Sequence, residues 1–250
     1  MKPATVAIAL AALAAAPSAH ALVARPDRDD EEYRELATRY PAAVRIPAAA
    51  ASGVVIAPRW VLTAAAPVAA FAAAPGKLGV EAKGRTHVVQ AIHLAAAPEA
   101  AVALLQLREP VDGIEPAPAW RRADEGGTAL RIVGFGIAGT AGGKEIRDGK
   151  ARAGVNTIDR VEARHLGVRL KGPDEASDLQ GALAEGDLGA PAFVELDGRA
   201  YVAGIALERA GAGEWERYAR VSALAEWIAS VTRRVAADEA AAAVGGAESR

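Results

Sequence analysis

The chain has no cysteine and few aromatic residues. Among its 250 residues only 4% are Phe, Trp or Tyr, although alanine-rich segments raise the hydrophobic fraction to 52%. Without cysteine there are no disulfides, so the fold must be stabilised by core packing. The net charge of −2 and the lack of a strongly basic run give no reason to expect nucleic acid or a membrane surface as partner. The length is enough for one all-β unit with a sizeable core.

Long apolar runs are also lacking, except at the N-terminus. Lys2 precedes the apolar stretch 6–13, and Ala19-His20-Ala21 has the A-x-A form of a signal-peptide cleavage site. The stretch is too short to span a bilayer. The sequence therefore predicts a signal peptide at 1–21, cleavage after Ala21, and a secreted or periplasmic protein with no integral membrane segment. A buried N-terminal helix is the alternative.

Histidine, the commonest general base in enzymes, is scarce as well. His20 would leave with the signal peptide, and each of the other three is more readily explained as a surface or structural residue: His87, His93 and His165. No pair of histidines has the spacing of metal ligands. The sequence therefore predicts no metal site and no other cofactor.

Five segments follow one another in a recognisable order. They are 52–66, 101–107, 131–136, the loop Gly186-Asp187-Leu188-Gly189-Ala190-Pro191, and the strand-like runs near 201–205 and 218–221. Their order and spacing resemble those of the trypsin-like serine protease family, which has the chymotrypsin fold. The resemblance implies an all-β fold with two antiparallel six-stranded β-barrels and a short C-terminal helix.

The three catalytic positions of that family are altered. Aligned with the family motifs, Ala66 stands at the histidine position, Ala101 at the aspartate position and Leu188 at the serine position. A serine hydroxyl attacks only when an imidazole, held in the right tautomer by a carboxylate, takes its proton. The backbone N–H groups of Gly186 and Leu188 could still form an oxyanion hole, which retains at best about 10³ to 10⁴-fold catalysis over water. The resemblance therefore implies a non-catalytic homologue.

Asp187 has a structural role in that family, where it pairs with the N-terminal ammonium group released on activation. Cleavage after Ala21 would expose Leu22-Val23-Ala24-Arg25, which is similar to the family's Ile-Val-Gly-Gly start. We expect the ammonium group of Leu22 to pair with Asp187 and to order the oxyanion loop without a separate activation step. The alternative is a solvated arm, with Asp187 acting only as a cap.

The specificity pocket of the family is expected to be closed in this chain. The alignment places Ala182 at the pocket floor, and it places Arg209 and Glu216 where the family has small residues. Arg209 and Glu216 would fill the opening or bridge it as an ion pair, unless they are ordinary exposed loop charges.

The sequence patterns divide the chain into successive parts. After an acidic arm with a short amphipathic turn at 33–37, strand patterns place barrel 1 at about 42–120 and barrel 2 at about 121–222. Helical spacing predicts a terminal helix over 222–235, which completes a domain spanning 22–235. The alanine-rich segment 236–250 is expected to be frayed or disordered.

Three kinds of function stay open. The first is a binding module that holds a protein or peptide partner on the old cleft surface, as a decoy or regulator. The second is a hydrolase, either a trypsin-like endopeptidase by family membership or an enzyme that uses another nucleophile, with Glu185 and Asp187 as candidate acid–base groups. The third is a structural protein of the cell envelope. The coordinated loss of three catalytic groups favours the first and the third.

Overall fold

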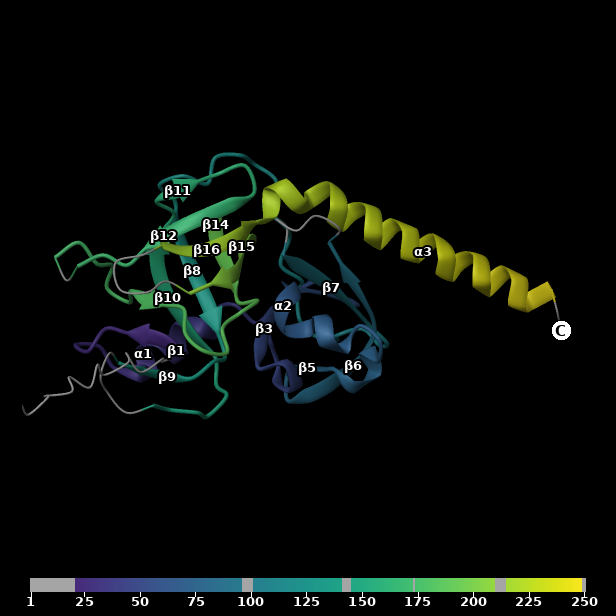
Figure 1. Cartoon of the computed structure of the whole chain (residues 1–250), viewed down its shortest axis with the longest axis horizontal. Helices are drawn as coiled ribbons and strands as arrows, with labels where there is room; N and C mark the ends of the chain where they lie inside the picture. The colour runs from purple at the N-terminus through teal and green to yellow at the C-terminus, as the bar shows by residue number, and fades with distance from the viewer. Residues whose placement is uncertain (1–20, 96–100, 141–144, 173, 210–214, 249–250) are drawn as a thin grey trace, which may run out of the picture.

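The computed structural model describes residues 21–95, 101–140, 145–172, 174–209 and 215–248 (Figure 1). The predicted signal peptide, except for Ala21, lies outside the described residues. Two β units lie side by side, and a long C-terminal helix extends from the second unit past the first. No helix in the described part of the chain combines the length and apolar character needed to cross a membrane.

The first unit is a closed six-stranded barrel, with strand order β2-β3-β4-β7-β6-β5. Its strands are β2 (Ala43–Ile46), β3 (Ala51–Ala57), β4 (Trp60–Ala64), β5 (Gly79–Ala82), β6 (Arg85–Leu94) and β7 (Val102–Leu107). β4 and β7 are buried along their whole lengths, since their leucine and valine side chains face the core or the neighbouring sheet. Three short turns of helix join the strands: α2 (Ala65–Val68) with two 3₁₀ turns, Ala69–Phe71 and Pro75–Lys77. A further 3₁₀ turn, Pro47–Ala49, lies between β2 and β3.

The second unit is an open seven-stranded sheet, with order β10-β8-β14-β15-β16-β12-β11. Its strands are β8 (Ala129–Gly134), β10 (Arg152–Thr157), β11 (Arg160–Val161), β12 (His165–Arg169), β14 (Pro191–Leu196), β15 (Arg199–Glu208) and β16 (Trp215–Arg220). The all-β class of the trypsin-like fold is confirmed, but this half is a half-barrel rather than a closed barrel of six strands. Three short strands instead form a separate sheet of order β13-β1-β9: β1 (Ala21–Ala24), β9 (Ala138–Thr140) and β13 (Gly181–Ala182).

The N-terminal arm contains a helix where the sequence predicted only a turn. Helix α1 (Asp30–Ala37) begins with acidic residues, which favour a helix N-terminus. The backbone N–H of Asp29 donates to the Glu32 carboxylate at 3.2 Å, which is one half of a capping box. Tyr33 is fully buried, and its hydroxyl donates to the carbonyl oxygen of Gln180 at 3.0 Å. The arm is therefore packed against the second unit.

The C-terminal helix is longer than the sequence predicted. After a 3₁₀ turn (Val221–Leu224), α3 runs from Ala225 to Glu248, so the expectation of a disordered tail from 236 is wrong for most of that segment. Alanine has the highest helix propensity, which supports a helix even where the side chains are exposed. The carboxylate of Glu239 also accepts hydrogen bonds from Arg59 at 3.0 Å and from Gln106 at 2.9 Å, both on the first barrel.

Candidate functional site

The loop before β14 crosses between the two β units. The carbonyl oxygen of Leu188 accepts a hydrogen bond from the Ser52 N–H at 2.9 Å, and the Gly189 N–H donates to Ala206 O at 2.8 Å. Gly189 has a φ of +84°, and a Cβ there would lie 2.2 Å from the Ser52 carbonyl oxygen. Only glycine fits this position, because no L side chain tolerates both the backbone angle and the contact. The loop is thus fixed to β3 and β15.

The three triad-equivalent positions lie at the edge of the first barrel that this loop reaches. Ala66 is on α2, directly after β4, and Ala101 directly precedes β7. The Ala65 N–H donates to the Ala101 carbonyl oxygen at 2.7 Å, which joins these two positions. A Cβ on Gly189, next to Leu188, would lie 3.0 Å from the Ala64 nitrogen. The structure therefore brings Ala66, Ala101 and Leu188 to one edge.

The side chains of these three positions, Ala66, Ala101 and Leu188, carry no group for nucleophilic or acid–base chemistry. Ala66 is exposed, whereas Ala101 and Leu188 are partly exposed. The described histidines lie elsewhere, on β6 and β12: His87, His93 and His165. His93 packs against Trp60 with ring centroids 5.4 Å apart, and its partial burial lowers its pKa. Among the described residues, no three His, Asp or Glu side chains are placed to hold a metal ion.

Asp187 is buried beneath the loop. Its Oδ1 accepts a hydrogen bond from the Gly136 N–H at 3.0 Å, and its Oδ2 accepts one from the Ala184 N–H at 3.1 Å. A Cβ on Gly134 would lie 2.0 Å from Oδ1, so the glycines of this strand end make room for the carboxylate. Asp187 therefore connects the loop to the end of β8.

The backbone of the N-terminal strand lies close to the predicted pocket floor. β1 pairs with β13, with Val23 opposite Ala182, and it also pairs with β9. Ala182 itself is buried. The pairing of a Leu22 ammonium group with Asp187 stays a prediction, since it concerns the chain after cleavage and the Leu22 side chain lies outside the described side chains.

Glu216 and Arg209 do not form the ion pair that the sequence suggested. Glu216 is 1% exposed and accepts hydrogen bonds from the Leu183 N–H and, at 2.7 Å, from the Tyr218 hydroxyl. Arg209 is exposed at the end of β15. Side chains alternate across β16, so Glu216 points inward while Arg217 points outward and pairs with Glu208 at 3.0 Å. Glu216 thus lies next to β13, the strand that carries the predicted pocket floor at Ala182, and Arg209 is not its partner.

The environment of Glu216 favours its protonated form. Burial, with a smaller contribution from the charge of Asp187, raises the pKa of Glu216 to about 7. The hydrogen bonds from Tyr218 and Leu183 act in the opposite direction, but they do not offset burial. Burial also raises the pKa of the Tyr218 hydroxyl. This carboxyl group was assigned only a space-filling role by the sequence, because its burial depends on the register of β16.

A sequence profile for the trypsin-like peptidase domain matches residues 51–205, which is more than half of the chain. The chain belongs to the trypsin-like peptidase family. A search of curated protein sequences gave no match.

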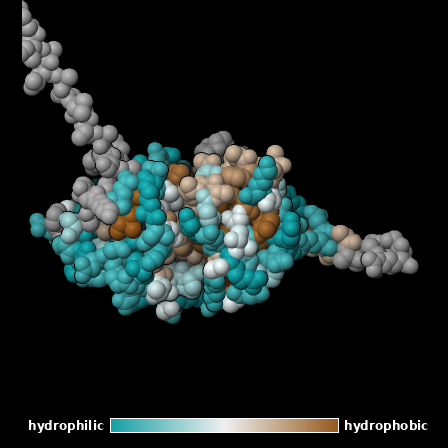
Figure 2. Space-filling view, turned by 90° about the horizontal axis from the view of Figure 1, so that it is seen from below, coloured by the Kyte–Doolittle hydropathy of each residue, from teal (hydrophilic) through white to brown (hydrophobic). Residues whose placement is uncertain are grey.

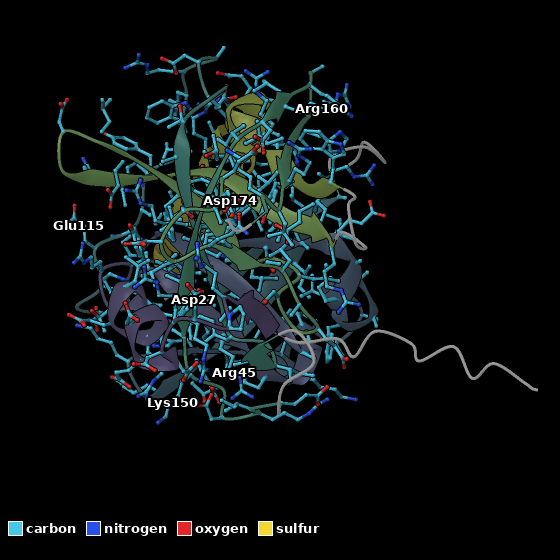
Figure 3. The ribbon with its side chains drawn as sticks, turned by 90° about the vertical axis from the view of Figure 1, so that its left-hand side faces the viewer. Asp27, Arg45, Glu115, Lys150, Arg160 and Asp174 are labelled. Atoms are coloured by element: carbon cyan, nitrogen blue, oxygen red, sulfur yellow. The ribbon has the colours of Figure 1, made fainter. Side chains whose placement is uncertain are left out.

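A hollow of about 190 Å³ lies beside the loop 186–191 of this trypsin-like domain, which we call the nucleophile loop after its place in the family. Arg45, Arg147, Phe135 and Glu185 are among its lining residues, together with Gly186. Sequence reasoning missed it because its residues come from distant segments. Figure 3 shows Arg45 and Lys150 near one another at this lower side of the molecule. In Figure 2, the surface is mostly hydrophilic, with hydrophobic patches that gather mainly over the first barrel.

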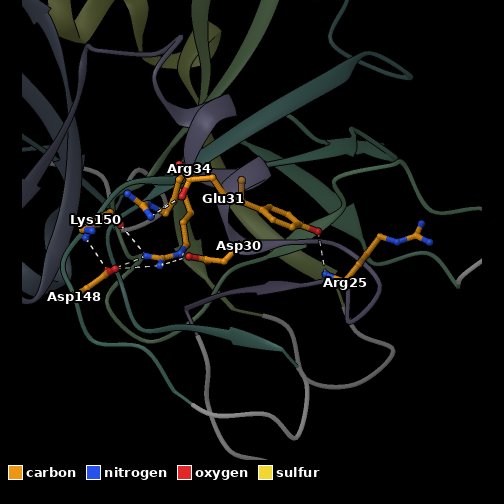
Figure 4. A network of polar contacts seen from close by, with 8 residues as sticks. Arg25, Asp30, Glu31, Arg34, Asp148 and Lys150 are labelled. Carbon is orange, nitrogen blue, oxygen red and sulfur yellow. Dashed lines mark hydrogen bonds and ion pairs between the residues drawn. The ribbon is translucent and has the colours of Figure 1, made fainter.

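A polar network holds the segment next to that hollow (Figure 4). The buried guanidinium group of Arg152 bonds to both carboxylate oxygens of Asp30 on α1 and, at 2.9 Å, to Asp148. The bonds from Arg152 lower the pKa of Asp148 to about 2. Next to Asp148, Gly149 has a φ of +65°, and a Cβ there would lie 3.0 Å from the Arg45 guanidinium carbon. The trypsin-like domain therefore uses its N-terminal helix to support one wall of the hollow.

Proposed function

We propose that this trypsin-like domain is exported, is catalytically inactive, and binds a protein or peptide segment on the surface around Ala66, Ala101 and Leu188. The observation that carries the proposal is the loop at Leu188. Its glycine geometry and its buried Asp187 are those of a constrained, ordered loop, yet its central side chain is an aliphatic group without a nucleophilic atom. The loop therefore supports a surface rather than a reaction.

The absence of all three catalytic groups supports inactivity. In enzymes of this mechanism, the loss of the serine or the histidine alone reduces turnover by about 10⁶-fold, and further losses add little. Backbone donors without a nucleophile give weak catalysis at most. Of the carboxyl groups near the loop, Asp187 and Glu216 are buried and hydrogen-bonded, so they are poorly placed to contact a substrate. Glu185 is exposed and lines the hollow, but an acid–base group alone does not replace the missing nucleophile.

The shape and composition of the edge support peptide binding. Leu188 is partly exposed and adds apolar area two residues after Gly186, which lines the hollow, and Arg45 and Arg147 supply hydrogen-bond donors at its wall. Apolar area with a few polar groups is typical of binding pockets. Export rests on the signal-peptide pattern at 1–21, and N-terminal sequencing of the secreted protein should begin at Leu22.

The deciding experiment is capture of partners by the mature chain, starting at Leu22, from the secreted proteins of its own source. Mass spectrometry would identify both intact partners and newly formed N-termini. We expect intact partners, no new termini, and loss of capture in the Leu188→Lys variant. Val161→Lys, at the exposed edge strand β11, is the matched control and should retain capture.

Two results would contradict the proposal. New termini with a consistent residue before the cut would show that the protein is a hydrolase, with a nucleophile outside the family positions. Equal capture by the Leu188→Lys variant and the wild type would show that binding does not use this surface.

A further inference from the structure

Glu216 connects β16 to the segment that leads into the nucleophile loop. Its Oε1 accepts the hydrogen bond of the Leu183 N–H, and its Oε2 accepts that of the Tyr218 hydroxyl. Leu183 follows the floor strand β13 and lies five residues before Leu188. The side chains of Leu183, Tyr218 and Glu216 are buried, with Glu216 only 1% exposed. The carboxyl group therefore holds the start of the loop from inside the fold.

Asp187 holds the end of the same segment. Its carboxylate accepts hydrogen bonds from Ala184 within the segment and from Gly136 at the end of β8. Segment 183–187 is therefore fixed at both ends by buried carboxyl groups. When both are ionised, two negative charges share one low-dielectric region and repel each other. In the mature chain the predicted Leu22 ammonium group would offset part of the Asp187 charge, so the burial of Glu216 is the main cause of its raised pKa.

Few other titratable groups face Glu216. Asp187 faces it from the loop and Tyr218 from its own strand, and both act on its charge. From β12, the residue paired with Glu216 is Val168, which is uncharged. The adjacent Arg217 is half exposed and pairs with Glu208 at the surface. Within the described residues, therefore, Glu216 forms no ion pair.

We propose that Glu216 is a pH-sensitive contact that holds segment 183–187 in place while protonated and loosens it when ionised. The surface around Leu188 would then be best ordered in acidic surroundings. The contact belongs to the fold itself, so it operates whether or not this surface binds a peptide.

Proton linkage determines how the stability of the closed segment 183–187 changes with pH. The closed segment binds the Glu216 proton more tightly than an open, solvated segment, because the pKa rises from 4.5 to about 7 on burial. The stabilisation is thus complete below about pH 4.5 and is lost as the pH rises through about 7. Over that interval, the open population should grow by up to about tenfold per pH unit, and then level off.

Native-state hydrogen exchange tests this directly. Amide protection at residues 183–189 of the mature chain would be measured from pH 5 to pH 8 and corrected for the intrinsic chemical exchange rate. We expect wild-type protection to fall by up to about 100-fold between pH 5 and pH 7. Glu216→Gln should abolish that dependence, whereas Glu208→Gln, which removes an exposed carboxylate on the neighbouring strand, should behave like the wild type. A parallel loss of protection in wild type and Glu216→Gln would overturn the proposal.

Two further measurements apply even if Glu216→Gln does not fold. Tyr218→Phe removes a donor that favours the ionised carboxylate, so the transition should move to higher pH; an unchanged or lower midpoint would contradict the proposal. Carbon-13 NMR of the wild-type Glu216 carboxyl group should titrate together with the exchange transition, and a midpoint near 4.5 would overturn the proposal. Neither measurement depends on partner capture, so the outcome is separate from that of the proposed function.

Discussion

The two β units are stabilised by different chemistry. In the first barrel, the buried polar side chains are neutral: Ser52, Thr63 and Gln106. In the second unit, the buried polar side chains are mostly charged or ionisable: Glu125, Arg152, Asn156, Asp187 and Glu216. The first unit is thus a closed hydrophobic barrel, whereas the second is an open sheet whose loops are held by hydrogen-bonded carboxyl groups. In this chain, the loop at Leu188 depends on the second kind of interaction.

A substitution affects the scaffold differently at an exposed position and at a buried carboxylate. At an exposed position such as Ala66, a change of side chain leaves the core closed. Removing a buried carboxylate would leave backbone donors unpaired, which costs about 1–3 kcal/mol for each donor. The side chains of Ala66 and Leu188 can therefore change without loss of the fold, whereas Asp187 has a structural reason to stay.

The largest effect is expected from Asp187→Ala. The substitution leaves the N–H groups of Gly136 and Ala184 without their carboxylate, and it opens a cavity beneath the loop. We expect the free energy of unfolding to fall by about 4 kcal/mol, as measured by urea denaturation. Glu185→Ala, the exposed neighbour, is the control and should change stability by less than about 0.5 kcal/mol. A loss below about 1 kcal/mol in Asp187→Ala would mean that the carboxylate does not hold the loop.

The stability of the first barrel should depend on the volume of its buried apolar side chains rather than on charged groups. Leu104 is fully buried on β7, at the centre of the barrel core. Leu104→Ala should reduce the free energy of unfolding by about 3 kcal/mol through lost burial and the resulting cavity. The loss should be the same at pH 7 and pH 9, since the fully buried polar groups of the barrel are neutral and burial lowers the pKa of His93, which lies opposite Leu104 on β6, from 6.5. A marked pH dependence would remove the distinction between the two units.

The sequence predicted the barrel side of the molecule well. Alternating and continuous apolar runs in β3, β4 and β7 determine their own burial, so periodicity and the family motifs were enough. The same motifs located the loop at Leu188 and the glycines that surround Asp187. Those positions are constrained locally, by backbone angle and by close contact.

The rest depends on contacts between distant residues. The sequence predicted only a turn at α1, because the helix packs through the distant contact between Tyr33 and Gln180. It placed the end of α3 too early, because Glu239 forms hydrogen bonds with Arg59 and Gln106 of the first barrel. The sequence placed Glu216 at the opening of the specificity pocket, as a filler or in an ion pair with Arg209, because the register of β16 could not be derived from its own residues. The second sheet is open because its edge strands, β10 and β11, do not pair with each other, and the sequence does not show which strands pair.

In the second unit, a smaller and pH-dependent effect on stability is expected from Asp148. Arg152 holds the pKa of Asp148 at about 2, below its ordinary value of 3.8. The stabilisation is present above about pH 3.8 and is lost as the pH falls through about 2. At pH 7, Asp148→Asn should cost about 1 kcal/mol, discounted for the partial exposure of this side chain. Thermal unfolding should show the wild type and the variant converging at acid pH; a constant difference would assign the loss to packing instead.

The smallest effect is expected where α3 crosses the first barrel. Glu239 is 44% exposed in its pair with Arg59, so the ion pair alone should contribute less than about 1 kcal/mol. Glu239→Ala keeps the helix propensity high, and global unfolding should change by about 0.5 kcal/mol. Amide exchange of α3 beyond residue 236 should nevertheless accelerate, because Glu239 connects the exposed part of the helix to Arg59 and Gln106. Asp238→Ala, one residue earlier and without a side-chain hydrogen bond or ion pair to the described residues, is the control. Equal exchange in both variants would show that alanine propensity alone keeps the distal helix folded.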